Sequence, residues 1–275
     1  MTSKNVAAVS AFIEGAPPGE LADVVNDIKA LTPEDRNILE SARPAFKKYN
    51  EEQLTTVKLP GSSNSVLISQ YNALDNERYY DVESQSSFAF DHVTQKASDV
   101  RSHVLESQHK DLITSLTRPL TTHAREHYPT STHAIFPVPS SPSTLAILLT
   151  SSKYSPSNFW NGRLRTIYLY NASTSTLTGT LKCDVHYYED GNVRLTTKKE
   201  VAETSIGGGG AAGEVIRVIA RIEKAWQEEL NRGFGRLSEG EFKSLRRQLP
   251  VTRQKVEWEK VGSYRAGKEI GGGRR

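Results

Sequence analysis

The stretch that decides the fold is Leu177-Thr178-Gly179-Thr180-Leu181-Lys182-Cys183-Asp184-Val185-His186-Tyr187-Tyr188. Its apolar residues recur at every second position from Leu181 to Tyr187, so they line one face of an extended strand. Asp190 and Gly191 follow, a dipeptide typical of β-hairpins, and Val193 begins a second run rich in β-branched residues. The pattern predicts two antiparallel strands joined by a two-residue turn.

Three upstream segments share this β-branched and aromatic character and are separated by turn residues. With the hairpin they give five predicted strands: His133–Val138, Thr144–Thr150, Arg163–Tyr170, Leu177–Tyr188 and Val193–Lys199. Consecutive short strands with intervening turns predict a five-stranded antiparallel meander. Within it, Cys183 is expected to face the core side as a small apolar residue, because His186, the nearest base in sequence, points to the opposite face.

The first 54 residues have helical periodicity instead. Their recurring apolar positions are Val6, Val9, Ile13, Leu21, Val24, Val25, Ile28 and Leu31. The Pro17-Pro18 pair ends a first helix, and Thr32-Pro33 predicts an N-cap and first position for a third helix that carries Ile38 and Leu39. Three short antiparallel helices are therefore expected, followed by short strands and loops over residues 55–98.

Two longer helices flank the predicted sheet. One starts at Asp111, and Pro119 is expected to kink or interrupt it. The other follows the Gly207–Gly210 run and ends near Gly233. Its apolar stripe comprises Val215, Ile219, Ile222, Trp226 and Leu230. A stripe of this kind has to be buried, and the preceding sheet is the nearest surface.

These segments predict an α+β fold in which a long helix covers a five-stranded antiparallel meander. The expected divisions are a helical stalk at 1–54, short strands, loops and a connecting helix at 55–131, the sheet at 132–200, a glycine linker and long helix at 201–235, and a basic segment at 236–275.

Composition excludes several classes of protein. Cys183 is the single cysteine of 275 residues, so no internal disulfide forms, and a reducing compartment is expected. The N-terminus lacks the continuous apolar segment of a secretory signal. The longest apolar run, Leu145–Leu149, is far shorter than the ~20 residues of a membrane span. The Asn171-Ala172-Ser173 sequon is accordingly interpreted as coincidental.

Charge is uneven along the chain. Residues 236–275 carry 11 Lys/Arg against 5 Asp/Glu, which leaves 24 and 27 of the chain's totals of 35 and 32 for the other 235 residues. Ser238 and Glu241 form a capping box that starts a helix in this basic tail, and Pro250 stops it. The predicted helix has an apolar stripe and a separate basic face that continues beyond it: Phe242, Leu245 and Leu249, then Lys243, Arg246, Arg247, Arg253 and Lys255.

Two motifs suggest enzymes, and their contexts argue against both. Gly208–Gly213 matches the dinucleotide pattern G-x-G-x-x-G, but such a site needs a parallel βαβ unit with an acidic residue at the end of its second strand, and here the helix runs into Gly233 and then a second helix. His123–His127 matches the inverted zinc-protease pattern H-x-x-E-H, yet Tyr128-Pro129 ends the helix and no further acidic motif follows. Both histidines are expected on a helix surface. We predict a binding protein with no catalytic residues, metal or cofactor.

Two stretches resemble signatures of the α subunit family of heterodimeric F-actin capping proteins: Asn158-Phe159-Trp160-Asn161-Gly162-Arg163 and Val185-His186-Tyr187-Tyr188-Glu189-Asp190-Gly191-Asn192-Val193. Leu245–Arg253, followed by Trp258, is similar to that family's C-terminal actin-binding region. Ala16–Glu20 and Ser87–His92 are weaker matches. The resemblance runs in order along nearly the whole chain, with departures at Gly207–Gly210, Pro119 and the Gly271–Arg275 end.

The resemblance implies that the chain pairs with a β subunit as an obligate heterodimer, through sheets that join. The heterodimer would bind the barbed end of actin filaments in the cytoplasm, at cortical actin structures. It would block addition and loss of subunits without calcium, nucleotide or severing. Lys243, Arg247 and Arg253 would contact actin, with Arg246 and Lys255 in the same patch. Phe242, Leu245 and Leu249 would seat the tail on the body. Regulators and phosphoinositides stay open as further partners.

Two other classes of function remain as alternatives. The basic tail would also suit a nucleic acid or an anionic membrane, although nucleic acid is not the expected partner. Phosphate binding would track total tail charge and fall steeply with salt, whereas actin binding would depend on particular positions. A metal-dependent hydrolase built on His123 and His127 would require stoichiometric zinc.

Overall fold

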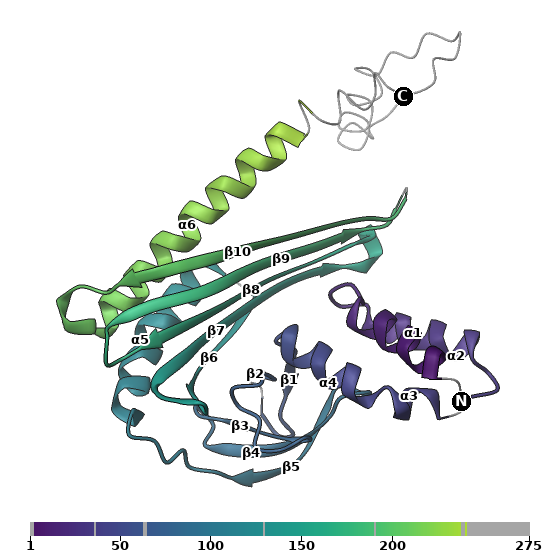
Figure 1. Cartoon of the computed structure of the whole chain (residues 1–275), viewed down its shortest axis with the longest axis horizontal. Helices are drawn as coiled ribbons and strands as arrows, with labels where there is room; N and C mark the ends of the chain where they lie inside the picture. Colours follow the sequence, from purple (N-terminus) through teal and green to yellow (C-terminus); the bar gives the residue numbers. More distant parts are fainter. Residues whose placement is uncertain are drawn as a thin grey trace, which may run out of the picture. The chain divides into compact units, whose positions relative to one another are not determined.

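A five-stranded antiparallel sheet is the central element of the computed structural model (Figure 1). The structure describes residues 3–35, 37–62, 65–128, 130–189, 191–237 and 240. The strands are β6 (Ser131–Val138), β7 (Ser141–Ser155), β8 (Trp160–Asn171), β9 (Thr176–Tyr187) and β10 (Val193–Ser205). Their order in the sheet, β10-β9-β8-β7-β6, is the predicted meander.

The β9–β10 turn is longer than predicted. Tyr187 pairs with Val193, so residues 188–192 connect the strands instead of a two-residue turn at Asp190 and Gly191. On the other side of β9, the ladder with β8 runs one residue further, because the Tyr188 amide donates to the Phe159 carbonyl oxygen at 2.9 Å.

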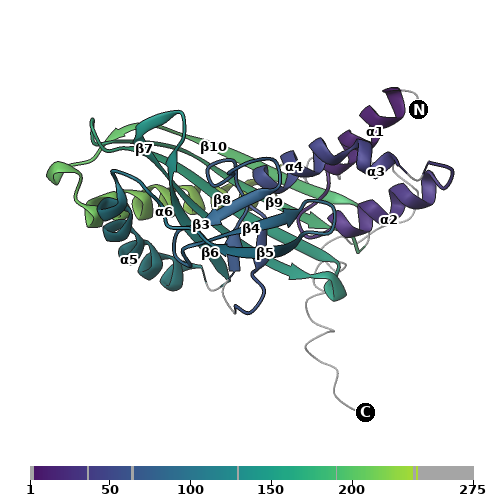
Figure 2. The same ribbon diagram turned by 90° about the horizontal axis from the view of Figure 1, so that it is seen from below.

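Both faces of the sheet are covered in its centre. Along β7 every side chain from Leu145 to Thr150 is buried. One face packs on two small antiparallel sheets and on the end of α4. The strands of these sheets are β1 (Thr56–Lys58), β2 (Ser65–Leu67), β3 (Arg78–Asp81), β4 (Ser86–Asp91) and β5 (Lys96–Ser102). Figure 2 shows them in front of the large sheet. The prediction of short strands after residue 54 is therefore confirmed.

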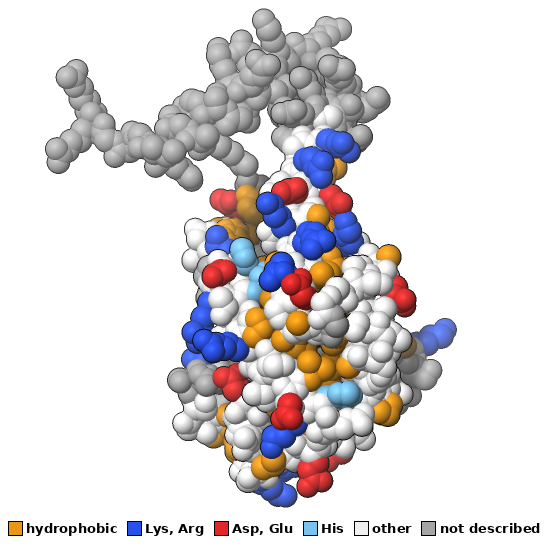
Figure 3. All heavy atoms as spheres, turned by 90° about the vertical axis from the view of Figure 1, so that its left-hand side faces the viewer, with side chains coloured by type: hydrophobic (Ala, Val, Ile, Leu, Met, Phe, Trp, Pro, Cys, Tyr) orange, Lys and Arg blue, Asp and Glu red, His pale blue; other side chains and the backbone are white. Residues whose placement is uncertain are grey.

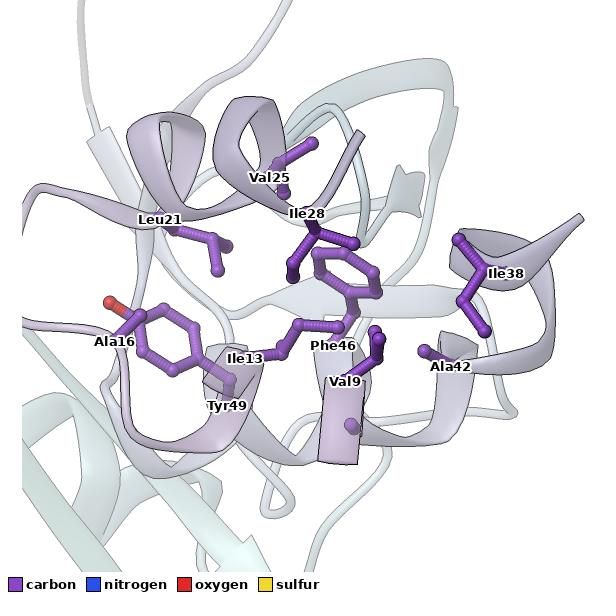
Figure 4. Packing of buried hydrophobic residues seen from close by; sticks show 11 residues of the cluster. Val9, Ile13, Ala16, Leu21, Val25, Ile28, Ile38, Ala42, Phe46 and Tyr49 are labelled. Atoms are coloured by element: carbon purple, nitrogen blue, oxygen red, sulfur yellow. The ribbon is translucent and has the colours of Figure 1, made fainter. Parts of the chain in front are cut away.

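The N-terminal region holds four helices rather than three: α1 (Ser3–Glu14), α2 (Leu21–Leu31), α3 (Ile38–Ser41) and α4 (Arg43–Glu52). Their apolar side chains converge in one cluster around Ile13 and Phe46 (Figure 4). Thr32 does not begin a helix. Its hydroxyl and its amide both donate to the Ile28 carbonyl oxygen, at 2.6 Å and 2.9 Å, and so terminate α2.

Helix α5 (Lys110–His127) runs along β6 and continues through Pro119 without a break. The predicted interruption is wrong, because Leu116 and Leu120 on either side of the proline are fully buried. That packing outweighs one lost backbone hydrogen bond.

Helix α6 (Ala212–Arg236) is the predicted long helix. The chain divides into two compact units, Met1–Lys224 and Ala225–Arg275, and the strands and the first part of α6 belong to the first unit. Gly210 precedes this helix with φ +74°, and a Cβ atom there would collide with the Tyr170 hydroxyl. Glycine is therefore required at position 210 by the backbone conformation and by the nearby Tyr170. None of the helices in the described residues combines the length and apolar character needed to cross a membrane.

Candidate interaction surfaces

Strand β10 forms an open edge of the sheet. Over its 13 residues it pairs with β9 on one side, and within the described part of the chain nothing pairs with its other side. Its first half is basic, with Arg194, Lys198 and Lys199, and its second half is acidic, with Glu200 and Glu203. A long exposed strand edge presents unpaired backbone donors and acceptors that favour strand addition by another chain.

A polar seam joins the connection between α1 and α2 to one end of the sheet. The Glu20 carboxylate lies 2.8 Å from His186 Nδ1, and it accepts a hydrogen bond from Asn161 Nδ2 at 2.8 Å. His186 Nε2 lies 2.8 Å from Asn192 Oδ1. His186 and Asn161 are buried, so these contacts fix the position of the helices against the sheet.

A second pair of charges reinforces the seam. Arg194 of β10 donates to both oxygens of Asp184, at 2.9 Å and 2.6 Å, and also donates to the Gly15 carbonyl oxygen. Asp184 is almost completely buried. The hydrogen bonds to this carboxylate raise the pKa of Arg194 above its ordinary value, so the guanidinium group stays charged.

Glu223 of α6 is a buried carboxylate surrounded by hydrogen-bond donors from α5, from the C-cap residue of α5 and from β8. Tyr128 and Tyr168 donate to it at 2.8 Å and 3.1 Å, and His123 Nε2 of α5 lies 2.8 Å away. Burial and Glu223 raise the pKa of Tyr168, which therefore stays a neutral donor. The cluster ties α5 and α6 to β8.

The location predicted for His123 is wrong. Its side chain is buried against Glu223, whereas His127 is exposed as expected. The cause is the packing of α6 on α5, which covers the first histidine of the motif. Among the residues that the structure describes, no group of three His, Cys, Asp or Glu side chains is placed to hold a metal ion.

Cys183 is half-buried, and burial raises the pKa of its thiol. A raised thiol pKa leaves little thiolate at neutral pH, the opposite of an activated nucleophile.

The scan of known families connects this fold with a function. The family model for the F-actin capping protein alpha subunit matches residues 9–269. A Neurospora crassa protein named F-actin-capping protein subunit alpha is 57% identical over 265 residues, which are 96% of this chain and 96% of its own length. The chain belongs to the F-actin capping protein alpha subunit family.

Relatives in yeast and a solved structure extend this result. The Saccharomyces cerevisiae F-actin-capping protein subunit alpha is 33% identical over 279 residues, 99% of each chain. The solved homodimeric actin capping protein alpha subunit of Plasmodium berghei superposes with a TM-score of 0.72 at 18% identity, covering 92% of this chain and 100% of that one. This last likeness shows the fold.

In this chain, the two signature stretches come together at the polar seam. Asn161 belongs to the first stretch, and His186 and Asn192 belong to the second. The signatures thus hold the helices on the sheet.

The predicted actin-contacting residues lie outside the described residues: Lys243, Arg246, Arg247, Arg253 and Lys255, together with the seating residues Phe242, Leu245 and Leu249. Their roles stay predictions.

Residue patterns alone did not indicate the roles of Glu20, Asp184 and Glu223. For Glu223 a signal existed, because it lies four residues after Ile219 and eight after Val215, on the apolar side of the helix. An acidic residue in that position predicts a buried carboxylate with dedicated donors.

Proposed function

We propose that this chain pairs with a capping protein β subunit, and that the heterodimer binds barbed ends of actin filaments. It blocks both addition and loss of subunits there, independently of calcium and without severing. The observation that carries the proposal is the open edge of β10, in a chain whose family is named as one subunit of a capping protein. A sheet with such an edge is complete only when another strand covers it.

Exposed apolar side chains support a subunit interface on the first compact unit. Val193 at the start of β10 is 58% exposed, and Phe12 and Leu31 on α1 and α2 are 62% and 77% exposed. Large apolar groups left in water favour contact with a partner. The basic-to-acidic charge order of β10 suits an antiparallel strand with the complementary order.

Filament binding is assigned to the basic tail at 236–275. Lys243, Arg247 and Arg253 form charge-assisted hydrogen bonds with an acidic surface of the filament end, and Arg246 and Lys255 add to the same patch. Phe242, Leu245 and Leu249 hold the tail segment in place. The proposed role is one of binding, without catalysis or cofactor, in the cytoplasm at the cortical actin cytoskeleton.

Co-expression with a β subunit tests the proposal. The chain alone should be largely insoluble, and the β subunit should rescue it as a one-to-one complex by light scattering. The complex should stop elongation from actin seeds at substoichiometric concentration, equally with calcium or with a chelator. A stable monomer of this chain would contradict the shared sheet.

Two other outcomes are informative. A soluble dimer of the chain by itself would indicate the homodimeric arrangement named for the Plasmodium berghei protein. A complex that leaves seeded elongation unchanged but retains DNA or anionic vesicles, with a steep salt slope, would favour the alternative of a general polyanion binder.

A further inference from the structure

A cavity of about 290 Å³ lies between the turn after β3, α5 and the start of β6. Its apolar wall comprises Val82, Ile113, Leu120, Ala134 and Ile135. It shares no residue with the polar seam, with β10 or with the tail. The side of the molecule that carries α5 faces the viewer in Figure 3, where hydrophobic side chains gather in the middle and charged ones lie around them. Such a volume is at the lower end for small-ligand sites.

The threonines of the cavity are acceptors. Thr114 and Thr117 line it, and their hydroxyl groups donate to the carbonyl oxygens of Lys110 and Ile113, at 2.9 Å and 2.8 Å. A hydroxyl has one proton to donate, so the remaining lone pairs of both oxygens can only accept.

His133 contributes an unsatisfied acceptor. Thr121 donates its hydroxyl proton to the Thr117 carbonyl oxygen at 2.8 Å, and His133 Nε2 lies 2.9 Å from the same hydroxyl oxygen. Nε2 must therefore carry the ring proton, which leaves Nδ1 bare. Nδ1 is buried without a partner in the described structure, and burial together with Arg125 lowers the pKa of His133. A buried acceptor without a donor is costly.

Two carboxylates also line the cavity. Asp81 is buried and accepts one hydrogen bond, from the Ser84 amide at 2.8 Å, while Glu83 is exposed. Arg118 is the cationic side chain among the described residues of the lining. The polar lining therefore has an excess of negative charge and, apart from Arg118, offers acceptors to a ligand.

We propose that this cavity binds a primary ammonium group carried on a short alkyl chain. The ammonium supplies three N–H donors and a positive charge for Asp81, Glu83 and the threonine oxygens, and the alkyl chain fills the apolar part. Two sources have this chemistry, a free diamine and a lysine side chain of another protein.

Calorimetric titration of the full-length chain, purified with its partner subunit if it requires one, tests the site. The probes are 1,4-diaminobutane, a blocked glycine-lysine-glycine peptide and 1-butanol, which has the alkyl body without the charge. At least one amine should bind about tenfold or more tightly than 1-butanol. The ¹⁵N resonance of His133 Nδ1 should move with that amine. The amine that binds identifies the source.

Variants locate the binding. Glu83→Gln removes one carboxylate with little change in shape and should weaken the amine about tenfold, as expected for one charge-assisted hydrogen bond. Thr117→Leu should fill the cavity and abolish binding. The matched control is Glu126→Gln. Glu126 is an exposed acid on α5 that lies outside the cavity, so this variant should leave the affinity for the amine unchanged.

The proposal is overturned if 1-butanol binds as well as both amines, because the cavity is then an apolar void. It is also overturned if neither amine binds, or if Glu83→Gln and Glu126→Gln weaken binding equally. Thr117→Leu serves as a second check if Glu83→Gln lowers the yield of folded protein.

Discussion

The two edges of the central sheet differ in how they are protected. β6 is short, contains Pro137, and packs against α5 and β2. β10 has 13 residues, no proline, and a free side in the described structure. A proline cannot donate to a ladder, so it is tolerated where no further strand has to pair.

The contrast indicates that the two edges of the sheet are protected by different chains. The β6 edge is closed by elements of this chain, and the β10 edge is left with its backbone donors for a second chain. Assembly should therefore be sensitive to changes on β10, and internal stability should be sensitive to changes around α5 and β6.

The largest expected effect comes from proline on β10. Neighbouring residues of an antiparallel strand direct their backbone groups to opposite sides. Of Thr196→Pro and Thr197→Pro, one therefore breaks pairing with β9, and the other blocks the open edge. The variant that blocks the open edge should abolish co-purification with the β subunit while circular dichroism still reports a folded chain. Wild-type yields of complex for both variants would show that β10 does not form the interface with the β subunit.

The next effect separates assembly from filament binding. Alanine at Lys243, Arg247 and Arg253 should leave the heterodimer intact, because none lies on the predicted apolar stripe. If each contact contributes roughly 1–2 kcal/mol, the triple variant loses about 3–6 kcal/mol of binding free energy. Affinity for barbed ends in seeded elongation should then fall at least about a hundredfold.

The control for the tail is a triple alanine variant at Lys260, Arg265 and Lys268, which removes the same formal charge nearer the end of the chain. It should modestly reduce the rate at which the heterodimer associates with barbed ends, because the long-range electrostatic attraction is weaker. Equal losses for both triples would mean that the tail acts by charge alone, and the assignment of particular contacts would be wrong.

The packing of α5 and α6 against β8 depends on Glu223. Glu223→Ala leaves the donors of His123, Tyr128 and Tyr168 buried without their acceptor, so it should cost about 3–5 kcal/mol of unfolding free energy. Denaturant unfolding of the purified complex measures this. Glu228→Ala on the same helix removes an exposed carboxylate and should change stability by less than about 0.5 kcal/mol. Equal midpoints for the two variants would contradict the cluster's role.

Sequence patterns were sufficient for the sheet because each strand is a run of β-branched and aromatic residues bounded by turn residues. The meander order, the long helix α6 and its exposed Arg217 and Arg221 follow from local periodicity. The errors lie where packing against distant residues overrides a local signal. Burial of Leu116 and Leu120 keeps α5 whole through Pro119, and Glu223 covers the side chain of His123.

The interaction surfaces were less predictable for the same reason. His123 and Glu223 are 100 residues apart, and periodicity assigns each to a helix face without showing which faces meet. Family resemblance indicated where the signature stretches lie but not that Glu20 joins them. The sequence does not show which edge of the sheet other elements cover, so the open edge of β10 could be identified only from the structure.

The smallest expected effect concerns His92, which follows β4 and contacts Tyr79 of β3 and Asn50 of α4. Tyr79 donates to Glu51 at 2.8 Å, so His92 Nε2, 3.2 Å from the same hydroxyl, carries the ring proton. Nδ1 lies 3.4 Å from Asn50 Nδ2, whose two protons go to the carbonyl oxygens of Phe46 and His92 at 2.8 Å and 2.9 Å. This arrangement suits the neutral ring. A second proton would face a donor.

Burial lowers the pKa of His92 from 6.5 to about 4. Between these values the unfolded chain binds a proton that the folded chain does not bind, so unfolding becomes easier as pH falls from 6.5 to 4. The full difference corresponds to about 3 kcal/mol. Denaturant midpoints of the complex measured from pH 7.5 to 4.5 should therefore decline, and His92→Gln should reduce the slope. If that variant keeps the wild-type slope, other groups cause the decline, and stability does not depend on a neutral histidine at this position.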